Sequence, residues 1–477
     1  MRKKRIVINT DFPLLKTGLG KNGRWLAEYL YKTDKYEILY YCCGMPWENP
    51  ELEKLPYKCH GVLPTDQNEI NQIHSRGEGY VRDAYYGLYN VDKVIKQFKP
   101  DVFIVSNDSW AYKEYLNKKW WNKINVIPHT TLDSTPFLPE QIDCFKKSKK
   151  IYVWADFAEA EAKRLGYNNV EVLTGIVKPD LLYKLPKHIK SELRKKYNIP
   201  EDAFITTMVF RNQLRKEVKM VMKGYAEWKK NNPQIKNTYL LFHTCFTEGQ
   251  GWDIRRFCEQ FGIPQNELLT TYICRNCKEY EIRPFTGNDL DCRFCGAQKA
   301  QININIQMGV SEEQLNEIYN LCDCMVHLAN AAGLEIPCVE GLYTELPLAV
   351  NSYAALEMFS KQPFVHEVRN TFSTQLGTQF ERAVPSYNDV AKFLDKIYRL
   401  PLSEREKIGK QGRTWALSKF APEVVCKQWE NIIDSMPLVE WDFNLDEPAK
   451  DPTAVSYTHL TLPTKPMMCR SRWSPYH

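Results

Sequence analysis

Two pairs of closely spaced cysteines carry the clearest chemistry in this sequence. Cys274 and Cys277 form one C-x-x-C pair, Cys292 and Cys295 form a second, and 14 residues separate the two pairs. Four thiolates at this spacing complete a tetrahedral shell around Zn²⁺, as in a zinc ribbon. A closed shell leaves no position for a reacting water molecule, so we predict a structural zinc that takes no part in catalysis.

Free thiols and disulfide bonds both fit the surrounding sequence less well than a metal site does. The segment between the pairs is polar and contains Arg283, Asn288 and Asp289, which disfavours four unliganded thiols in a core. Disulfide bonds would need an oxidising compartment, and residues 1–12 combine basic side chains with an apolar run too short for a secretion signal. We therefore expect reduced cysteines and a cytoplasmic protein, with peripheral attachment to a membrane left open.

Two cations and a carboxylate form the second group of candidate residues. Arg211 and Lys216 follow a buried strand that we expect over 203–210. Glu340 lies close to the start of a helix whose first turn contains Pro337. A carboxylate behind a small-residue loop, at the carboxyl end of a strand, lies where open α/β sheets bind their ligands. Taken alone, the two cations would be ordinary surface charges.

Residues 309–359 contain the elements that would position Glu340. Ser311 and Gln314 form a capping box, and an amphipathic helix follows them. A short apolar strand is expected over 323–328, followed by a loop, a second helix and a second strand. The same alternation of strands and helices elsewhere in the chain predicts parallel sheets that are covered by helices on both faces.

Length and composition limit the class of protein. At 477 residues the chain exceeds the size at which a single core stops growing, so we expect two domains of about 200 residues each. A content of 43% hydrophobic and 26% charged residues is typical of soluble globular proteins. The formal charge of +6 is small for this length, so we expect no nucleic-acid partner. No stretch approaches about 18 uninterrupted apolar residues, so we expect no transmembrane segment.

The order of elements over 309–359 resembles the nucleotide-binding half of GT-B glycosyltransferases, particularly the large retaining family typified by glycosyltransferase family 4. When Pro337 is placed on the proline of the family motif, Glu340 falls on the second of its two glutamates. That glutamate usually accepts hydrogen bonds from the ribose of the donor. Ala332 replaces the first glutamate, which normally lies against the donor sugar. Glu335, three residues later, is our candidate for a carboxylate supplied from a shifted position.

The two cations also match the family. Arg211 and Lys216 fall on the arginine and lysine of its pattern G-R-x-x-x-x-K-G, while Phe210 and Glu217 replace the two glycines. Cleavage of a nucleotide sugar leaves negative charge on the diphosphate, and two fixed cations at a strand end can stabilise that charge. The resemblance therefore implies that this pair serves the donor diphosphate.

Two glycine-containing loops are further candidates for donor binding. The resemblance implies that the backbone around Gly333 and Leu334, together with the shifted glutamate, faces the donor sugar. Gly18 and Gly20 lie in a loop whose counterpart in the family approaches the donor phosphates or the acceptor. Their spacing is not the dinucleotide fingerprint, and a tight turn before a helix starting near Arg24 explains them at least as well.

Asp108 is the catalytic candidate in the first part of the chain. It follows a strand expected over 101–105, where family members often place a catalytic histidine or aspartate, and no histidine stands there. We consider Asp108 for acceptor contact or general-base work, with a helix N-cap as the competing role. His129, at the end of another expected strand, is interpreted as structural.

The resemblance implies an α/β protein of the GT-B type, in which two Rossmann-like, doubly wound domains face a cleft. Residues 174–177 resemble the turn that ends the first domain in the family. The end of the chain shows no periodic pattern, and its sequence looks like sequencing-adapter read-through. We divide the chain into an acceptor-side domain (1–178), a nucleotide-sugar-binding domain (188–400) with a zinc-ribbon insertion (270–300), helices crossing back to the first domain (401–440) and a disordered or artefactual tail (447–477).

The resemblance implies a glycosyltransferase that moves a sugar from a UDP- or GDP-linked donor to an acceptor hydroxyl. The resemblance implies retention of anomeric configuration and no catalytic metal. No motif identifies the acceptor, which is a saccharide, a lipid-linked molecule or a protein. Ala332 and the absence of a histidine after 101–105 motivate the alternative, an inactive GT-B scaffold whose zinc ribbon binds a partner. A nucleic-acid-binding ribbon would need a basic, aromatic-rich surface, which the mixed charges of 270–300 do not provide.

Overall fold

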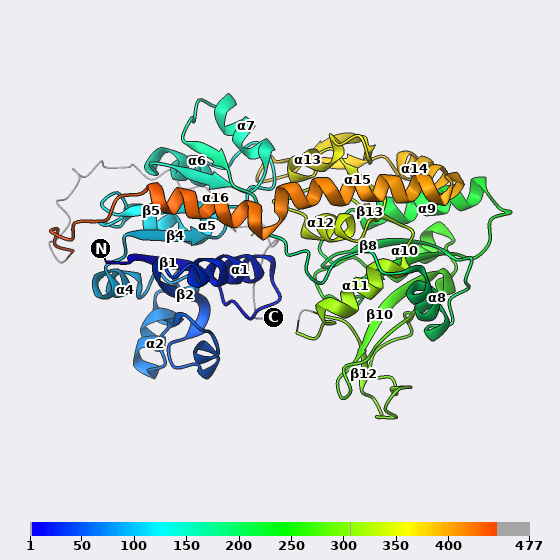
Figure 1. Cartoon of the computed structure of the whole chain (residues 1–477), viewed down its shortest axis with the longest axis horizontal. Coiled ribbons are helices and arrows are strands. Elements are labelled where there is room, and N and C mark those ends of the chain that lie inside the picture. Colours follow the sequence, from blue (N-terminus) through cyan, green and yellow to red (C-terminus); the bar gives the residue numbers. More distant parts are fainter. Residues whose placement is uncertain (1, 306, 446–477) are drawn as a thin grey trace.

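The computed structural model describes residues 2–305 and 307–445. The tail predicted over 447–477 lies outside the described residues. The described chain forms two α/β halves that lie side by side, each built on its own sheet (Figure 1). No helix in these described ranges is both long and apolar enough to cross a membrane.

The first half is built on a seven-stranded parallel sheet with the order β3-β2-β1-β4-β5-β6-β7. The strand order reverses between β1 and β4, and the carboxyl ends of strands at such a reversal are where open sheets bind ligands. The strands are β1 (Lys4–Asp11), β2 (Tyr36–Pro46), β3 (Lys58–Leu63), β4 (Val102–Ser106), β5 (Asn125–Thr130), β6 (Ile151–Val153) and β7 (Val170–Val172). The helices are α1 (Gly18–Lys32), α2 (Gln67–Ser75), α3 (Glu78–Tyr85), α4 (Val91–Phe98), α5 (Ser109–Tyr112), α6 (Pro139–Lys147) and α7 (Asp156–Arg164).

The second half contains an eight-stranded sheet with the order β11-β10-β9-β8-β13-β14-β15, and β12 also pairs with β10. Its order reverses between β8 and β13, and β11 and β12 run antiparallel to β10. The strands are β8 (Phe204–Val209), β9 (Thr238–His243), β10 (Leu268–Cys274), β11 (Tyr280–Pro284), β12 (Gln301–Asn303), β13 (Cys324–His327), β14 (Leu348–Asn351) and β15 (Val365–Val368), with a separate hairpin of β16 (Asn370–Thr374) and β17 (Glu381–Pro385). The helices are α8 (Lys187–Lys196), α9 (Val218–Asn231), α10 (Ile254–Phe261), α11 (Glu312–Leu321), α12 (Ile336–Tyr343), α13 (Glu357–Ser360) and α14 (Tyr387–Arg399).

The last two helices connect the halves. α15 (Leu402–Phe420) lies along the second half and α16 (Pro422–Ser435) lies along the first, and Figure 1 shows them in orange as one nearly continuous rod. Lys35 Nζ, just beyond α1, donates to Glu430 Oε1 of α16 at 2.5 Å. Near the junction of the two helices, the Val177 N–H donates to the Phe420 carbonyl at 2.9 Å. The C-terminal helices therefore pack on both halves.

Strands at the centre of each sheet are buried on both faces, as their continuous apolar runs predict. In β1, Ile6 and Ile8 pack with Trp25 of α1 in one core cluster, while Val7 packs with Val94 of α4 in another. Alternate residues of the strand therefore pack against helices on opposite faces of the sheet.

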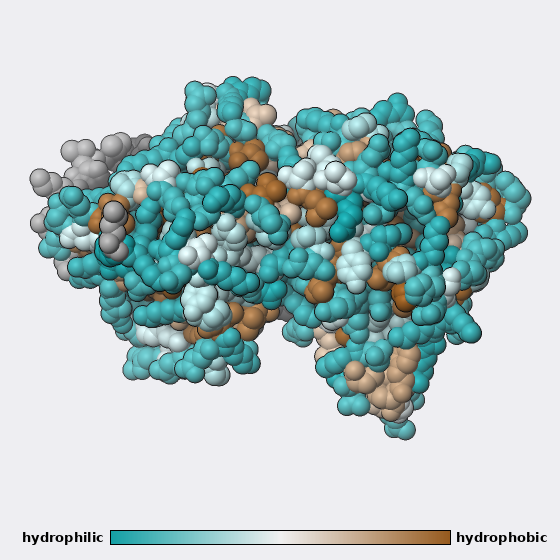
Figure 2. Space-filling view, viewed as in Figure 1, coloured by the Kyte–Doolittle hydropathy of each residue, from teal (hydrophilic) through white to brown (hydrophobic). Residues whose placement is uncertain are grey.

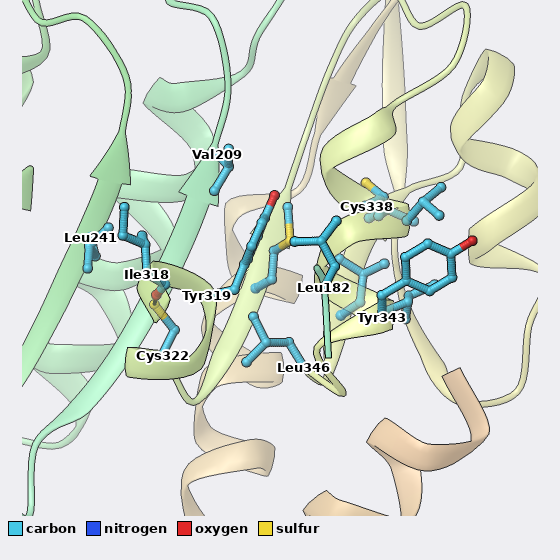
Figure 3. Packing of buried hydrophobic residues seen from close by; sticks show 14 of the residues in the cluster. Leu182, Val209, Leu241, Ile318, Tyr319, Cys322, Cys338, Tyr343 and Leu346 are labelled. Carbon is cyan, nitrogen blue, oxygen red and sulfur yellow. Dashed lines mark hydrogen bonds between the residues drawn. The ribbon is translucent and has the colours of Figure 1, made fainter. Parts of the chain in front are cut away.

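The core of the second half joins the two helices that surround the candidate donor residues. Figure 3 shows Ile318 of α11 next to Leu241 of β9, with Tyr319 of the same helix and Cys338 and Tyr343 of α12 in the same cluster. The capping box predicted for the start of α11 is confirmed. Packing of these buried side chains fixes both helices against the sheet.

The start of α1 was predicted wrongly. The helix begins at Gly18 and not near Arg24, because the Thr17 hydroxyl accepts the Gly20 N–H at 3.0 Å and caps the first turn. The glycine-rich segment is therefore part of the helix.

Candidate functional site

The loop after β8 lies against the loop after β13, where the strand order of the second sheet reverses. The Glu217 N–H donates to the Leu328 carbonyl at 3.0 Å, and the Asn330 N–H donates to the Arg215 carbonyl at 2.9 Å. These backbone bonds hold Lys216 beside the second loop, where it is only 3% exposed. The predicted cation therefore lies at the position where a doubly wound sheet binds its ligand.

Glu335 lies at the centre of a buried cluster of charged and titratable groups. Lys216 Nζ donates to its Oε2 atom, and Arg215 Nη1 donates to its Oε1 atom at 3.0 Å. His327 Nε2 lies 2.9 Å from Oε2 and must carry the proton of that hydrogen bond, because the carboxylate can only accept. Both carboxylate oxygens of Glu335 are thus engaged within the second half.

The cluster changes the proton affinity of its members. Burial alone would raise the pKa of Glu335, but the charges of Lys216 and Arg215 outweigh it and hold that pKa well below its usual value. Burial, with the charge of Arg215, lowers the pKa of Lys216 to about 8 despite the attraction of Glu335. Burial also lowers the pKa of His327, so this imidazole is neutral at pH 7.

Glu335 was predicted to supply a carboxylate to the donor sugar. The structure places it in direct contact with the predicted diphosphate cation, at 3% exposure. A role toward the sugar stays a prediction, whereas its contact with Lys216 gives it a second candidate role as the counter-ion that orients that cation.

The loop that contains Gly333 and Leu334 lies between the two halves. The Ala332 N–H donates to the carbonyl of Asp133, which follows β5 of the first half, at 3.0 Å. A Cβ atom on Gly175 would lie only 2.7 Å from the Leu334 side chain, so this loop also packs closely against the end of the first half. The predicted sugar-binding backbone therefore lies where the two halves meet.

Arg211 pairs with a different carboxylate from Lys216. Its Nη2 atom donates to Glu248 Oε1 at 3.2 Å, in the loop after β9. The side chain is partly exposed, at 29%. The structure thus brings Arg211 and Lys216 to the same strand end, with separate carboxylate partners.

Glu340 is buried near the start of α12 and its side chain is held in place. The Tyr319 hydroxyl donates to its Oε2 atom at 2.9 Å. Burial raises the pKa of Glu340, and the charge of Lys21 from the first half partly opposes this. Lys21 also pairs with Glu312 at the start of α11, at 3.3 Å. A cation of one half thus lies close to the predicted ribose ligand of the other.

Gly18 and Gly20 play different parts in the first turn of α1. A Cβ atom on Gly18 would lie 3.1 Å from Ile336 at the start of α12, so Gly18 lies between the halves. A Cβ atom on Gly20 would lie 2.9 Å from the carbonyl of Phe12, in the segment that leads from β1 into α1. Contact with donor phosphates stays a prediction for both glycines.

Asp108 stands at the N-cap position of α5, but its side chain makes no capping hydrogen bond. Its Oδ1 atom accepts the hydroxyl of Thr131, which follows β5. Nearby, Asp11 at the end of β1 accepts the Thr17 hydroxyl at 2.7 Å. Burial raises the pKa of Asp11, the Thr17 bond lowers it, and the charge of Asp108 raises it further. Two carboxylates therefore lie where the order of the first sheet reverses.

His129 has the structural role that was expected. The residue is 2% exposed, and its ring stacks on Trp154. Its Nδ1 atom lies 3.1 Å from the Ser106 hydroxyl oxygen, and its Nε2 atom lies 2.7 Å from the Leu173 carbonyl oxygen. Burial lowers its pKa to about 4.

The four predicted metal ligands come together in space. The sulfur atoms of Cys274, Cys277, Cys292 and Cys295 all lie within 4.8 Å of one another. The Cys274–Cys295 and Cys277–Cys292 pairs are each separated by 3.8 Å. Tetrahedral Zn²⁺ with bonds of about 2.3 Å requires sulfur atoms about 3.8 Å apart. The spacing fits a closed thiolate shell.

N–H groups surround this shell as they do in metal-thiolate sites. The Asn276 backbone N–H donates to Cys274 Sγ at 3.4 Å, and the Asn276 side chain donates to Cys295 Sγ at 3.6 Å. The Ala297 N–H and this side chain lower the pKa of Cys295, which favours the thiolate form that binds a metal.

Sequence reasoning missed several residues of the site. Arg215 is adjacent to the predicted lysine, and Lys21 lies in the glycine-rich segment, so both carried a positional signal. His327 and Asp11 each end a largely buried strand, and a polar residue at that position indicates the ligand edge of a sheet.

The chain is similar to solved proteins in structure, although no known protein-family profile matches it. No curated protein matches it in sequence. Sucrose-phosphate synthase from Thermosynechococcus elongatus matches its structure with a TM-score of 0.62 and 13% sequence identity, over 91% of this chain and 98% of that chain. A glycosyltransferase from Rickettsia africae matches with a TM-score of 0.60 and 13% identity, over 91% and 99%.

The HepE protein of Anabaena, solved in complex with UDP, also matches, with a TM-score of 0.60 and 11% identity over 91% of this chain and 100% of that chain. Likenesses at such low identity show the fold. The chain therefore has the predicted GT-B fold, with two Rossmann-like domains and a four-cysteine cluster in the second.

Proposed function

We propose that this chain is a glycosyltransferase that uses a nucleotide-sugar donor. The observation that carries the proposal is the pair Lys216 and Glu340, a cation and a carboxylate that are both buried beside the strand reversal of the second sheet. Burying a charge is costly unless it serves a partner or a ligand. The Lys216 ammonium can bind a negatively charged diphosphate, and the Glu340 carboxylate can accept hydrogen bonds from the hydroxyls of a ribose.

Each candidate residue has a role in this proposal. Lys216 and Arg211 stabilise the negative charge on the diphosphate, and Glu340, oriented by the Tyr319 hydroxyl, accepts hydrogen bonds from the ribose. Gly333 and Leu334 present their backbone to the sugar. The HepE structures include a complex with UDP-glucose, which makes UDP the first nucleotide to test, with GDP as the second.

In the transfer itself, the acceptor hydroxyl oxygen forms a bond to the anomeric carbon while the bond from that carbon to the diphosphate oxygen breaks. The hydroxyl proton leaves with the diphosphate or passes to a base. We propose Asp108 as the residue that orients the acceptor, and we propose retention of configuration without a catalytic metal. We also propose that the four cysteines hold a structural zinc.

A second proposal is an inactive GT-B scaffold whose ribbon binds a partner. It is favoured by Ala332, which is fully buried and offers no carboxylate to a sugar. Sugar turnover separates the two proposals, since both predict nucleotide binding and only the first predicts turnover.

Saturating UDP, GDP or ADP should identify the donor base through thermal unfolding of the full chain. A nucleotide that binds only the folded state at about 100 times its dissociation constant should stabilise it by roughly 2.7 kcal/mol. Glu340→Gln should remove most of this shift, because an amide accepts ribose hydrogen bonds more weakly than a carboxylate.

Glu404→Ala, which alters an exposed glutamate at the start of α15, is the matched control and should keep the full shift. A Glu340→Gln protein that keeps the full shift would remove Glu340 from the donor site. No shift with any of the three nucleotides would overturn the proposed function.

Nucleotide affinity should fall as the pH rises above about 8. The pKa of Lys216 is lowered to about 8, so the cation that binds the diphosphate is lost as the pH rises through that value. Protonated Lys216 becomes about tenfold scarcer between pH 7 and pH 9. The groups facing Lys216 are Glu335, Arg215, His327 and the Cys338 thiol, and burial raises the pKa of that thiol.

Calorimetric titration at several pH values measures this effect. Lys216→Arg, which stays charged throughout, is the control and should give a flatter profile. Equal slopes for the two proteins would show that another group controls binding.

A further inference from the structure

The four-cysteine ribbon begins at the same sheet edge as the proposed donor site. β8, β9 and β10 are parallel, so their carboxyl ends meet at one edge. Cys274, the first of the four cysteines, is the last residue of β10, and β11 and β12 return antiparallel to it. Figures 1 and 2 show this part of the chain projecting from the second half. The body of the ribbon projects away, but its base lies beside the loops that follow β8 and β9.

Asn303, in β12, ties the ribbon to the loop after β9. Its Oδ1 atom accepts the Phe246 N–H at 2.7 Å. Its amide donates to the Thr244 carbonyl at 3.2 Å and to the Thr271 carbonyl at 2.9 Å. The side chain is buried, so these bonds are not exchanged for bonds to water. One amide thus fixes the loop 244–252 against both β10 and β12.

The loop 244–252 in turn holds the loop that carries the two cations. Glu248 accepts from Arg211 at 3.2 Å, and the Trp252 indole N–H donates to the Lys216 carbonyl at 2.7 Å. Asn212 bonds to both the N–H and the carbonyl of Trp252, each at 2.9 Å. A displacement of the loop 244–252 would therefore displace the cations.

A second path leads from the ribbon to the proposed ribose ligand. The Tyr280 hydroxyl of β11 donates to Glu317 of α11 at 2.7 Å. On the same helix, the Tyr319 hydroxyl donates to Glu340 at 2.9 Å. The ribbon therefore contacts structures on both sides of the proposed nucleotide, at the diphosphate and at the ribose.

We propose that the metal-bound ribbon positions the donor site and that Asn303 is the positioning residue between them. The occupancy of the metal site and the affinity for nucleotide are therefore linked. This inference rests on the proposed function. A chain whose ribbon has lost its metal loses the fixed end of β12, so the loop 244–252 and its cations become less well ordered. Because such coupling is reciprocal, a bound nucleotide strengthens metal binding by the same factor.

The test measures zinc affinity of the full chain with and without saturating UDP, by competition with a chromophoric chelator. Zinc binding should tighten by about tenfold when UDP is bound, a typical size for such coupling. In Asn303→Ala the ribbon should still bind zinc, but UDP should tighten it by less than about twofold. Gln298→Ala is the matched control, because this exposed residue of the same ribbon lies outside the path through Asn303, and it should behave as the unaltered chain.

The outcomes separate the two levels of the proposal. UDP that binds the metal-loaded chain without changing its zinc affinity overturns the linkage and leaves the donor site standing. An Asn303→Ala protein with the full tenfold effect removes Asn303 from the path. Failure of UDP, GDP and ADP to bind the metal-loaded chain overturns the donor site, and the linkage with it.

Discussion

Replacing Lys216 with alanine should lower sugar turnover by about two to three orders of magnitude, the typical cost of removing one group that stabilises transition-state charge. The diphosphate would keep Arg211 but lose the cation that is buried at the strand reversal. Release of nucleotide from the donor in single-turnover experiments measures the effect on the chemical step directly.

The same substitution also leaves Glu335 with fewer partners, and breaking a buried ion pair costs about 3–5 kcal/mol. Arg215 still bonds to this carboxylate, so the lower end of that range is expected. Lys216→Met combined with Glu335→Gln removes both charges and should recover much of the stability without recovering turnover. Lys230→Ala, on the exposed end of α9, is the control. Full turnover in Lys216→Ala would exclude this lysine from catalysis.

Replacing Cys292 with serine should remove the metal and open the ribbon. Three thiolates and a hydroxyl do not close the tetrahedral shell, and structural zinc contributes apparent binding energies of about 10–16 kcal/mol in zinc-finger peptides. Zinc content should fall from about one ion per chain to nearly none. Proteolytic cleavage should appear between Cys274 and Cys295, where the ribbon loses its fixed structure.

Cys59→Ser, which alters a half-buried thiol in β3 of the first half, is the matched control and should keep its zinc. A Cys292→Ser protein that retains a full equivalent of zinc would show that the metal is held elsewhere. A chain purified without any metal, yet resistant to proteolysis in the ribbon, would show that the four thiols need no ion.

Local patterns in the sequence were sufficient to predict much of the fold. The capping box at Ser311 and Gln314 predicted the start of a helix, and short apolar runs predicted strands. Both signals depend only on residues that are close together in the sequence. The cysteine spacing predicted the four-cysteine cluster because two short knuckles on a hairpin bring their thiols together whatever the rest of the fold does.

Contacts between distant segments could not be predicted in this way. The partners of Glu335 depend on how the loops after β8 and β13 pair. The positions of Arg215 and His327 mark the ligand edge of the sheet, but the sequence does not show that either residue contacts Glu335. The approach of Lys21 to Glu340 depends on how the two halves face each other. These features arise from tertiary packing, which a single sequence does not display.

The described part of the chain crosses between the halves twice, and the two crossings touch through the bond from Val177 to Phe420. The crossings therefore join the halves at one place. The halves also meet through the backbone bond from Ala332 to Asp133 and through the ion pair from Lys21 to Glu312, so a motion that parts the halves at these points must break both contacts.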